Sequence, residues 1–84
     1  TNSAALAQIL AKDYTSAKTT LSKIKNADAT TSYLQAVLAA RTGDASALSS
    51  SLKNAIQQDG TLAARAAKDL EFAKYANVVK NLVK

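Results

Sequence analysis

The side chains able to do chemistry in this 84-residue chain are few, and no catalytic pattern is found among them. The chain has no His and no Cys, so the usual proton shuttle, thiol nucleophile, disulfide bond and common zinc ligands are absent. Of the six carboxylates only Asp69 and Glu71 lie close, and residues two apart on a helix point in different directions. No glycine-rich loop is present to hold phosphate. We therefore expect a non-enzymatic protein with no catalytic residue, cofactor, metal or small-molecule substrate.

The charge balance is basic, with eleven Lys and Arg against six Asp and Glu and a net charge of +5. Such a balance can indicate nucleic acid or anionic lipid as a partner. Here the basic residues are spread along the chain, and no aromatic residues lie between them as a stacking platform for bases. We expect a solvated cationic surface, and nucleic-acid or anionic-surface binding is the most distant alternative. No stretch approaches the roughly 20 apolar residues of a membrane span.

The composition favours helices. The chain contains 19 Ala, two Gly and no Pro, and only four residues are aromatic. Alanine has the best helix propensity and packs poorly on a pleated sheet. The predicted fold class is therefore all-α, and short connections make neighbouring helices antiparallel.

A repeat of 31 residues organises the chain. Four aspartates follow one another at intervals of 15, 16 and 15 residues: Asp13, Asp28, Asp44 and Asp59. Leu21 and Leu52 share the offset of 31 residues. A fixed period in this range is typical of a helical repeat. Each aspartate precedes a helical stretch, so we expect it to accept first-turn N–H groups rather than to bind a ligand.

The expected helices follow from these signals and from apolar spacing. We predict Ser3 as the first N-cap and Gly43 as a left-handed helix end, and the stretch Asp69–Tyr75 stays open. The predicted helices cover Ser3–Ala11, Tyr14–Lys25, Ala29–Thr42, Ala45–Gln58, a segment from Thr61, and Asn77–Val83. These form one domain, 1–84, with repeat 1 at about 1–27, repeat 2 at about 28–58, and C-terminal capping helices at about 60–84.

The motifs in this repeat resemble the tetratricopeptide repeat. The first copy is Lys12-Asp13-Tyr14-Thr15-Ser16-Ala17 followed by Leu21 and Ile24, and Gly43-Asp44 with Leu48, Leu52 and Ala55 repeats it. Ala5 and Ala36 fall where the family usually has Gly. The sequence departs from the family in its period, which is about 34 there. It also has Ser32, Gln8 and Ala39 at usual aromatic positions, and lacks the closing Pro.

Taken from Leu6 to Tyr75, the chain resembles the C-terminal repeat region of Bacteroidetes cell-envelope proteins and lipoproteins. This resemblance implies hairpins stacked as a right-handed superhelix of five to six helices, a cell-envelope or periplasmic location, and a protein or peptide partner. In such a stack the first helices of the hairpins line a concave surface. The side chains best placed to face that groove are Tyr33, Arg41, Arg65 and Lys68.

Each of these four residues also has a simpler interpretation. Tyr33 suits a packing position, and the three basic residues suit a solvated surface. An arginine in the groove would hold a carboxylate through two parallel hydrogen bonds. Two functions therefore remain: a protein-interaction scaffold, or a purely structural cap of a longer array. A deep cleft with converging polar groups favours the first, and a filled groove favours the second.

The two ends of the chain differ in character. The first helix carries Ala4, Ala5, Leu6, Ala7, Ile9 and Leu10, so it is apolar around most of its circumference and expects cover on more than one side. We expect that cover from upstream repeats of a longer parent chain or from a second copy. The absence of an initiator Met agrees with a fragment. The C-terminus resembles the finished end of an array, because Asp69–Tyr75 breaks the repeat and the short segment after it ends in Lys80, Asn81 and Lys84.

Overall fold

The computed structural model describes residues 1–82, and this part of the chain is all-helical, as predicted. Six α-helices and one 3₁₀ helix follow one another without a strand in this range. They are α1 (Asn2–Leu10), α2 (Tyr14–Ser22), α3 (Ala29–Thr42), α4 (Ala45–Gln58), α5 (Thr61–Lys68), the 3₁₀ helix η1 (Leu70–Tyr75) and α6 (Ala76–Leu82). The predicted end of the last helix at Val83 lies outside the described residues.

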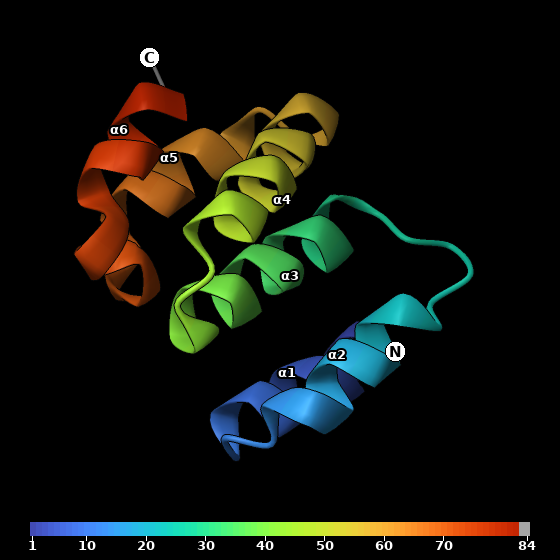
Figure 1. The fold of residues 1–84 in the computed structure, drawn as a ribbon. Helices are drawn as coiled ribbons and strands as arrows, with labels where there is room; N and C mark the ends of the chain where they lie inside the picture. The colour runs from blue at the N-terminus through green and yellow to red at the C-terminus, as the bar shows by residue number, and fades with distance from the viewer. Residues whose placement is uncertain (83–84) are drawn as a thin grey trace.

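The helices pack as consecutive antiparallel pairs along the chain (Figure 1). The pair α1–α2 packs through both of its helices against α3, which is itself the partner of α4. The segment η1 then packs on α3, and α6 packs on α4 and α5. Helix α3 is therefore surrounded on most sides, and nine of its residues are buried.

The two N-terminal hairpins repeat the same local geometry at the 31-residue offset. Lys12 and Gly43 both adopt positive φ, at 64° and 80°, and each ends its turn immediately before an aspartate. Ala5 and Ala36 are both fully buried, which lets the paired helices approach closely. The predicted equivalence of Leu21 and Leu52 agrees with the structure, because both are buried in the core.

Three of the four repeat aspartates cap helices as predicted, whereas the prediction was wrong for Asp59, because Gly60 occupies the N-cap position of α5. The carboxylates of Asp13, Asp28 and Asp44 accept hydrogen bonds from the backbone N–H groups three residues later. Asp28 forms a reciprocal capping box, because its own N–H donates to the Thr31 hydroxyl. Asp59 accepts from the Thr61 N–H across Gly60. These local hydrogen bonds satisfy donors that a helix start leaves free.

The predicted first N-cap and the predicted end of the second helix were wrong, whereas the end of α1 and the start of α6 each differ from the prediction by one residue. Thr1 caps α1 in place of Ser3, because the Thr1 hydroxyl accepts from the Ala4 N–H and the helix already includes Ser3. Helix α2 ends at Ser22 rather than Lys25. There the N–H groups of Lys23 and Ile24 bond to carbonyls three residues back, which tightens the last turn and stops the α-helix. An extended connector then leads to α3 (Figure 1).

The open stretch Asp69–Tyr75 breaks the last repeat. Helix α5 ends at Lys68, and Asp69 is extended, with φ −81° and ψ 120°. The Asp69 carboxylate accepts from the Glu71 N–H and so begins η1. This break carries Glu71 and Phe72 onto α3, where Phe72 is buried in the core.

Candidate functional site

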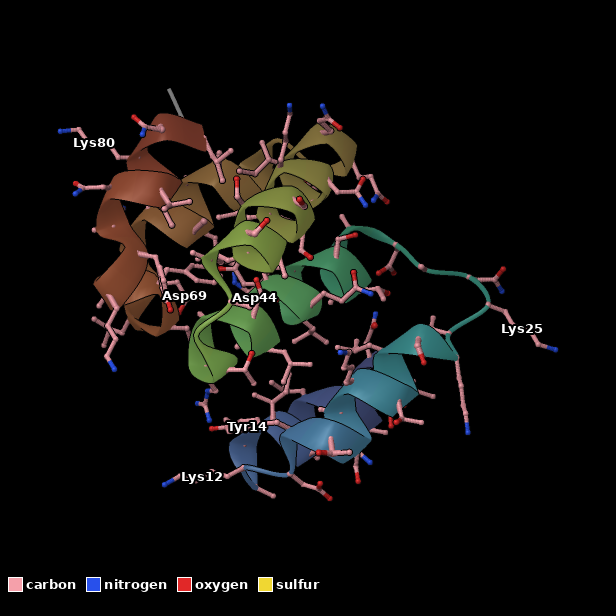
Figure 2. The ribbon with its side chains drawn as sticks, viewed as in Figure 1. Lys12, Tyr14, Lys25, Asp44, Asp69 and Lys80 are labelled. Carbon is pink, nitrogen blue, oxygen red and sulfur yellow. The ribbon has the colours of Figure 1, made fainter. Side chains whose placement is uncertain are left out.

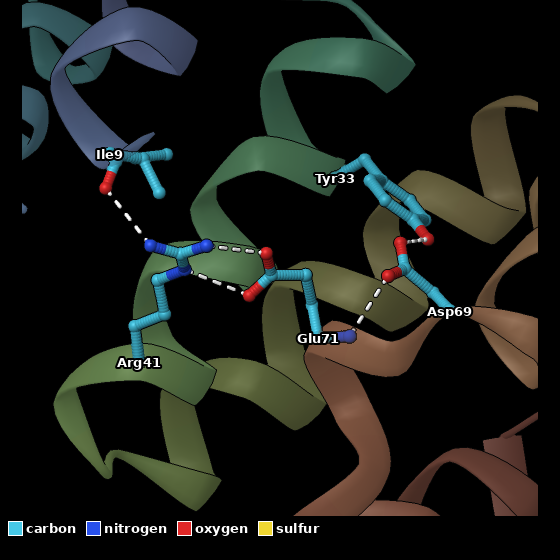
Figure 3. A network of polar contacts seen from close by, with 5 residues as sticks. All are labelled: Ile9, Tyr33, Arg41, Asp69 and Glu71. Carbon is cyan, nitrogen blue, oxygen red and sulfur yellow. Dashed lines mark hydrogen bonds and ion pairs between the residues drawn. The ribbon is translucent and has the colours of Figure 1, made fainter. Parts of the chain in front are cut away.

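Tyr33 of α3, a predicted groove residue, lies in the interface with η1 and is only 2% exposed. Its hydroxyl donates to Asp69 Oδ2 at 2.6 Å, as Figure 3 shows. Its ring meets Phe72 edge-on, with ring centroids 5.5 Å apart. Burial, reinforced by the Asp69 carboxylate, raises the pKa of Tyr33 well above its ordinary value, so the phenol stays protonated and donates.

Arg41, two turns further along α3, holds a carboxylate through two parallel hydrogen bonds. Its Nε and Nη2 donate to the two oxygens of Glu71, at 2.8 and 2.6 Å. Its Nη1 donates to the Ile9 carbonyl at 3.1 Å, so one guanidinium joins α1, α3 and η1 (Figure 3). The hydrogen bonds with Glu71 raise the pKa of Arg41 above its ordinary value. The carboxylate expected from the resemblance to a peptide groove is here supplied by the chain itself.

Sequence reasoning did not assign Asp69 and Glu71 to this network. Their contacts with Tyr33 and Arg41 join residues 36 and 30 positions apart. A usable signal was present: Tyr33 and Arg41 are eight residues apart on one helix face, and the chain offers two acids in the unassigned segment. Pairing them requires knowing that this segment folds back onto α3.

The other two candidates lie on α5 and are exposed. The Arg65 guanidinium stands 4.7 Å above the centre of the Tyr33 ring, a cation–π contact. Within the described residues, Lys68 has neither a hydrogen bond nor an ion pair through its side chain. The structure thus brings Tyr33 and Arg65 together, places Arg41 at the other end of α3, and leaves Lys68 apart.

The carboxylates of the described residues take part in hydrogen bonds within the chain. All six carboxylates accept hydrogen bonds, four at helix starts and two in the α3–η1 interface. Among residues 1–82, no group of three potential metal ligands comes together. The buried polar side-chain atoms of these residues all have partners as well. Figure 2 shows most charged side chains, including Lys12, Lys25 and Lys80, pointing outward.

Among residues 1–82, large apolar side chains are exposed on two elements, α1 and η1. Leu6 and Leu10 on α1 are 43% and 62% exposed, and Leu70 at the start of η1 is 89% exposed. The two α1 leucines are four residues apart, so they share one helix face. We call Leu6 and Leu10 the α1 leucine face.

Two open cavities flank the hairpins. The first, of about 560 Å³, lies between the start of α2, the end of α3 and η1, and Arg41, Leu70, Glu71 and Lys74 are among its lining residues. The second, of about 420 Å³, lies between α2, α3 and α4. Its floor includes Leu21 and Leu38, and Lys18 and Asp44 also line it.

Comparisons of the chain with protein-family models, with curated proteins and with solved structures find no match. Over residues 1–82, no helix combines the length and the hydropathy that crossing a membrane requires.

Proposed function

We propose that this chain is a non-catalytic protein-interaction module of the helical-repeat type, and that the α1 leucine face is its contact surface. The proposal rests on one observation: equivalent positions of the two repeats differ in their solvent exposure. Leu6 corresponds to Val37 at the 31-residue offset, yet Leu6 is 43% exposed and Val37 only 5%. Leu6 and Leu10 add exposed apolar surface beside the buried Ala5 and Ile9 of the same helix, and exposed apolar surface favours a binding role.

The groove residues support a second role for the C-terminal part. Tyr33 and Arg41, the two α3 residues that were expected to face a peptide, are bonded to Asp69, which precedes η1, and to Glu71 of η1. A filled groove favours the structural-cap alternative, in which the last elements shield the end of an array. We propose that residues 60–82 perform this capping role while α1 makes the external contact.

The repeat identity and the location are part of the same proposal. The matching left-handed residues Lys12 and Gly43, and the matching caps Asp13 and Asp44, support a tetratricopeptide-like repeat. The resemblance to Bacteroidetes envelope proteins then suggests the cell envelope, with upstream repeats of a parent chain among the candidate partners.

Sedimentation of the isolated chain at rising concentration tests the proposed contact surface. At ~1 M NaCl the Debye length is about 3 Å, so the +5 charge opposes self-contact only weakly. We expect the wild type to associate and the doubly substituted Leu6→Ser/Leu10→Ser chain to remain monomeric. A wild type that stays monomeric at every concentration would contradict the assignment of α1 as an interface.

A further inference from the structure

Arg41 joins three elements through one planar group. Its Nε and Nη2 donate to the two oxygens of Glu71 in η1, at 2.8 and 2.6 Å, and its Nη1 donates to the Ile9 carbonyl in α1, at 3.1 Å. Because the guanidinium is planar, a carboxylate that holds two of its nitrogens also sets the direction of the third. Glu71 therefore directs Nη1 toward the end of α1 (Figure 3).

The end of α1 receives a cation that its own last turn does not carry. The last carbonyls of a helix lack partners within the helix and bear a partial negative charge. Helix α1 has no basic residue in its last turn. Arg41 of α3 supplies the positive charge there, at an Ile9 carbonyl that also accepts from the Lys12 N–H. Loss of this contact would therefore weaken the hold of α3 on α1.

The α1–α2 hairpin is attached to α3 at two ends. Near the connector, Asn2 donates to Asp28 and accepts from the Thr31 hydroxyl. At the far end, the guanidinium donates to α1. Both open cavities reach this far end, because Tyr14 at the start of α2 borders each of them, as do residues near the end of α3. The packing there is incomplete, so the hydrogen bond from the guanidinium makes up a larger share of the attachment than it would in a filled interface.

We propose that the Arg41–Glu71 pair couples η1 to the α1–α2 hairpin, so that release of Glu71 loosens the hairpin from α3. Without the carboxylate, the Arg41 side chain regains rotamer freedom, and holding it against Ile9 then costs entropy that the fixed guanidinium does not lose. Coupling between two equilibria is reciprocal, so separation of α1 from α3 also weakens the hold on η1. One side chain thereby links elements near both ends of the chain, and this coupling needs no partner.

A second contact between α3 and the C-terminal segment provides the control. The Tyr33 hydroxyl donates to Asp69 Oδ2 at 2.6 Å, and the Tyr33 ring packs on Phe72. Among residues 1–82, the Tyr33 side chain has no hydrogen bond to α1. Tyr33→Phe therefore weakens the attachment of this segment to α3, while the guanidinium and both of its acceptors stay in place.

Amide hydrogen exchange of the full chain, followed by NMR, tests the coupling. The amides of Ile9 and Leu21, buried residues of α1 and α2, report opening of the hairpin. The amides of Leu52 and Ala55 in α4 report global unfolding, so the ratio of the two exchange rates isolates the hairpin. Circular dichroism of each variant checks that the helices are retained.

Three substitutions at the pair should change this ratio in a defined way. We expect Glu71→Gln to speed exchange of the hairpin amides about three- to tenfold relative to the α4 amides, and Tyr33→Phe to leave the ratio near that of the wild type. Arg41→Lys keeps the positive charge but not the planar fork, and should also speed the hairpin amides. In an Arg41→Met background, Glu71→Gln should have no further effect on the hairpin amides, because the coupling passes through the guanidinium.

Unchanged exchange of the hairpin amides in Glu71→Gln would overturn the coupling. If that variant loses its helices, the same ratio in Arg41→Lys decides the question, and an unchanged ratio there would overturn the coupling as well. Equal acceleration by Tyr33→Phe would show that any loosening of the C-terminal segment suffices. An effect of Glu71→Gln that persists in the Arg41→Met background would bypass the guanidinium. Either result would overturn the role assigned to Arg41.

Discussion

At the scale of single residues, the carboxylates hold the backbone at helix starts and join one helix to another. Asp28, for example, accepts from the Thr31 N–H, the Thr31 hydroxyl and the Asn2 amide, and so ties α1 to the start of α3. Asp69 accepts from the Tyr33 hydroxyl and from the Glu71 N–H at once. A substrate would have to displace such a partner before it could use these carboxylates, which favours a structural role for each acid.

The Asp28 carboxylate makes stability depend on pH. Hydrogen bonds, first from the Thr31 N–H and then from Asn2 and Thr31 side chains, lower the pKa of Asp28 below its ordinary 3.8. Because the folded pKa is below the unfolded one, this contribution is present above the unfolded pKa and disappears as pH falls through the folded pKa.

Thermal unfolding of Asp28→Asn from pH 7 to pH 2 checks this dependence. Asn retains the capping acceptor but not the charge. We expect the melting temperature of the wild type to exceed that of the variant at neutral pH, and the difference between the two melting temperatures to shrink below about pH 4. A difference that stays constant across the whole range would show that the charge does not contribute.

The Arg41–Glu71 pair should hold η1 on α3. Arg41→Met removes three hydrogen bonds and leaves a carboxylate that is only 29% exposed without its cation. A hydrogen bond to a charged group contributes about 1.5–3 kcal/mol to the free energy of unfolding, and partial exposure to solvent reduces that contribution. We therefore expect Arg41→Met to lower the free energy of unfolding by roughly 1–3 kcal/mol. Urea unfolding measures it. Lys53→Met on the exposed side of α4 is the control, and an equal midpoint for both variants would refute the role of the pair.

At the scale of elements, the two hairpins use one turn design with two different residues. Lys12 and Gly43 both lie in the left-handed region, where glycine is unstrained and lysine is not. Each is followed by an aspartate that caps the next helix. The turn between α2 and α3 is different, because it is a longer connector with no glycine.

Exchanging these turn residues should change stability in opposite directions. Lys12→Gly relieves backbone strain and should stabilise the chain by a few tenths to about 1 kcal/mol. Gly43→Ala introduces the strain and should cost about 1 kcal/mol; its Cβ would lie 3.9 Å from the Tyr75 hydroxyl, an ordinary contact. Lys12→Ala is the control that removes the charge alone. Thermal melting measures all three, and a Lys12→Gly chain no more stable than Lys12→Ala would contradict the shared turn design.

Elements governed by local signals could be predicted from the sequence, and those governed by tertiary contacts could not. The starts of α2, α3 and α4 follow from an aspartate cap, which acts within three residues. The early end of α2 could not be predicted, because no Gly or Pro marks it. The course of Asp69–Tyr75 depends on contacts with Tyr33 and Arg41, which lie 36 and 30 positions before their partners. The sequence therefore did not reveal that Asp69 and Glu71 belong to the site.

At the scale of the whole molecule, the chain has one closed face and one open face. Across α3 the face is closed by η1, with Phe72 buried and Tyr33 and Arg41 paired to acids. Across α1 the equivalent face exposes Leu6 and Leu10. An apolar outer side for the first helix was expected from the sequence. The sequence did not predict that the chain itself covers α3, because that prediction requires knowing where η1 lies in the fold.

Solvent paramagnetic relaxation of the leucine methyl groups tests this account most directly. In a dilute solution of the chain with a soluble paramagnetic agent, the methyls of Leu6 and Leu10 should relax fast, whereas those of Leu34 and Leu38 on α3, 7% and 8% exposed, should be protected. Similar protection of all four leucines would contradict an open face on α1.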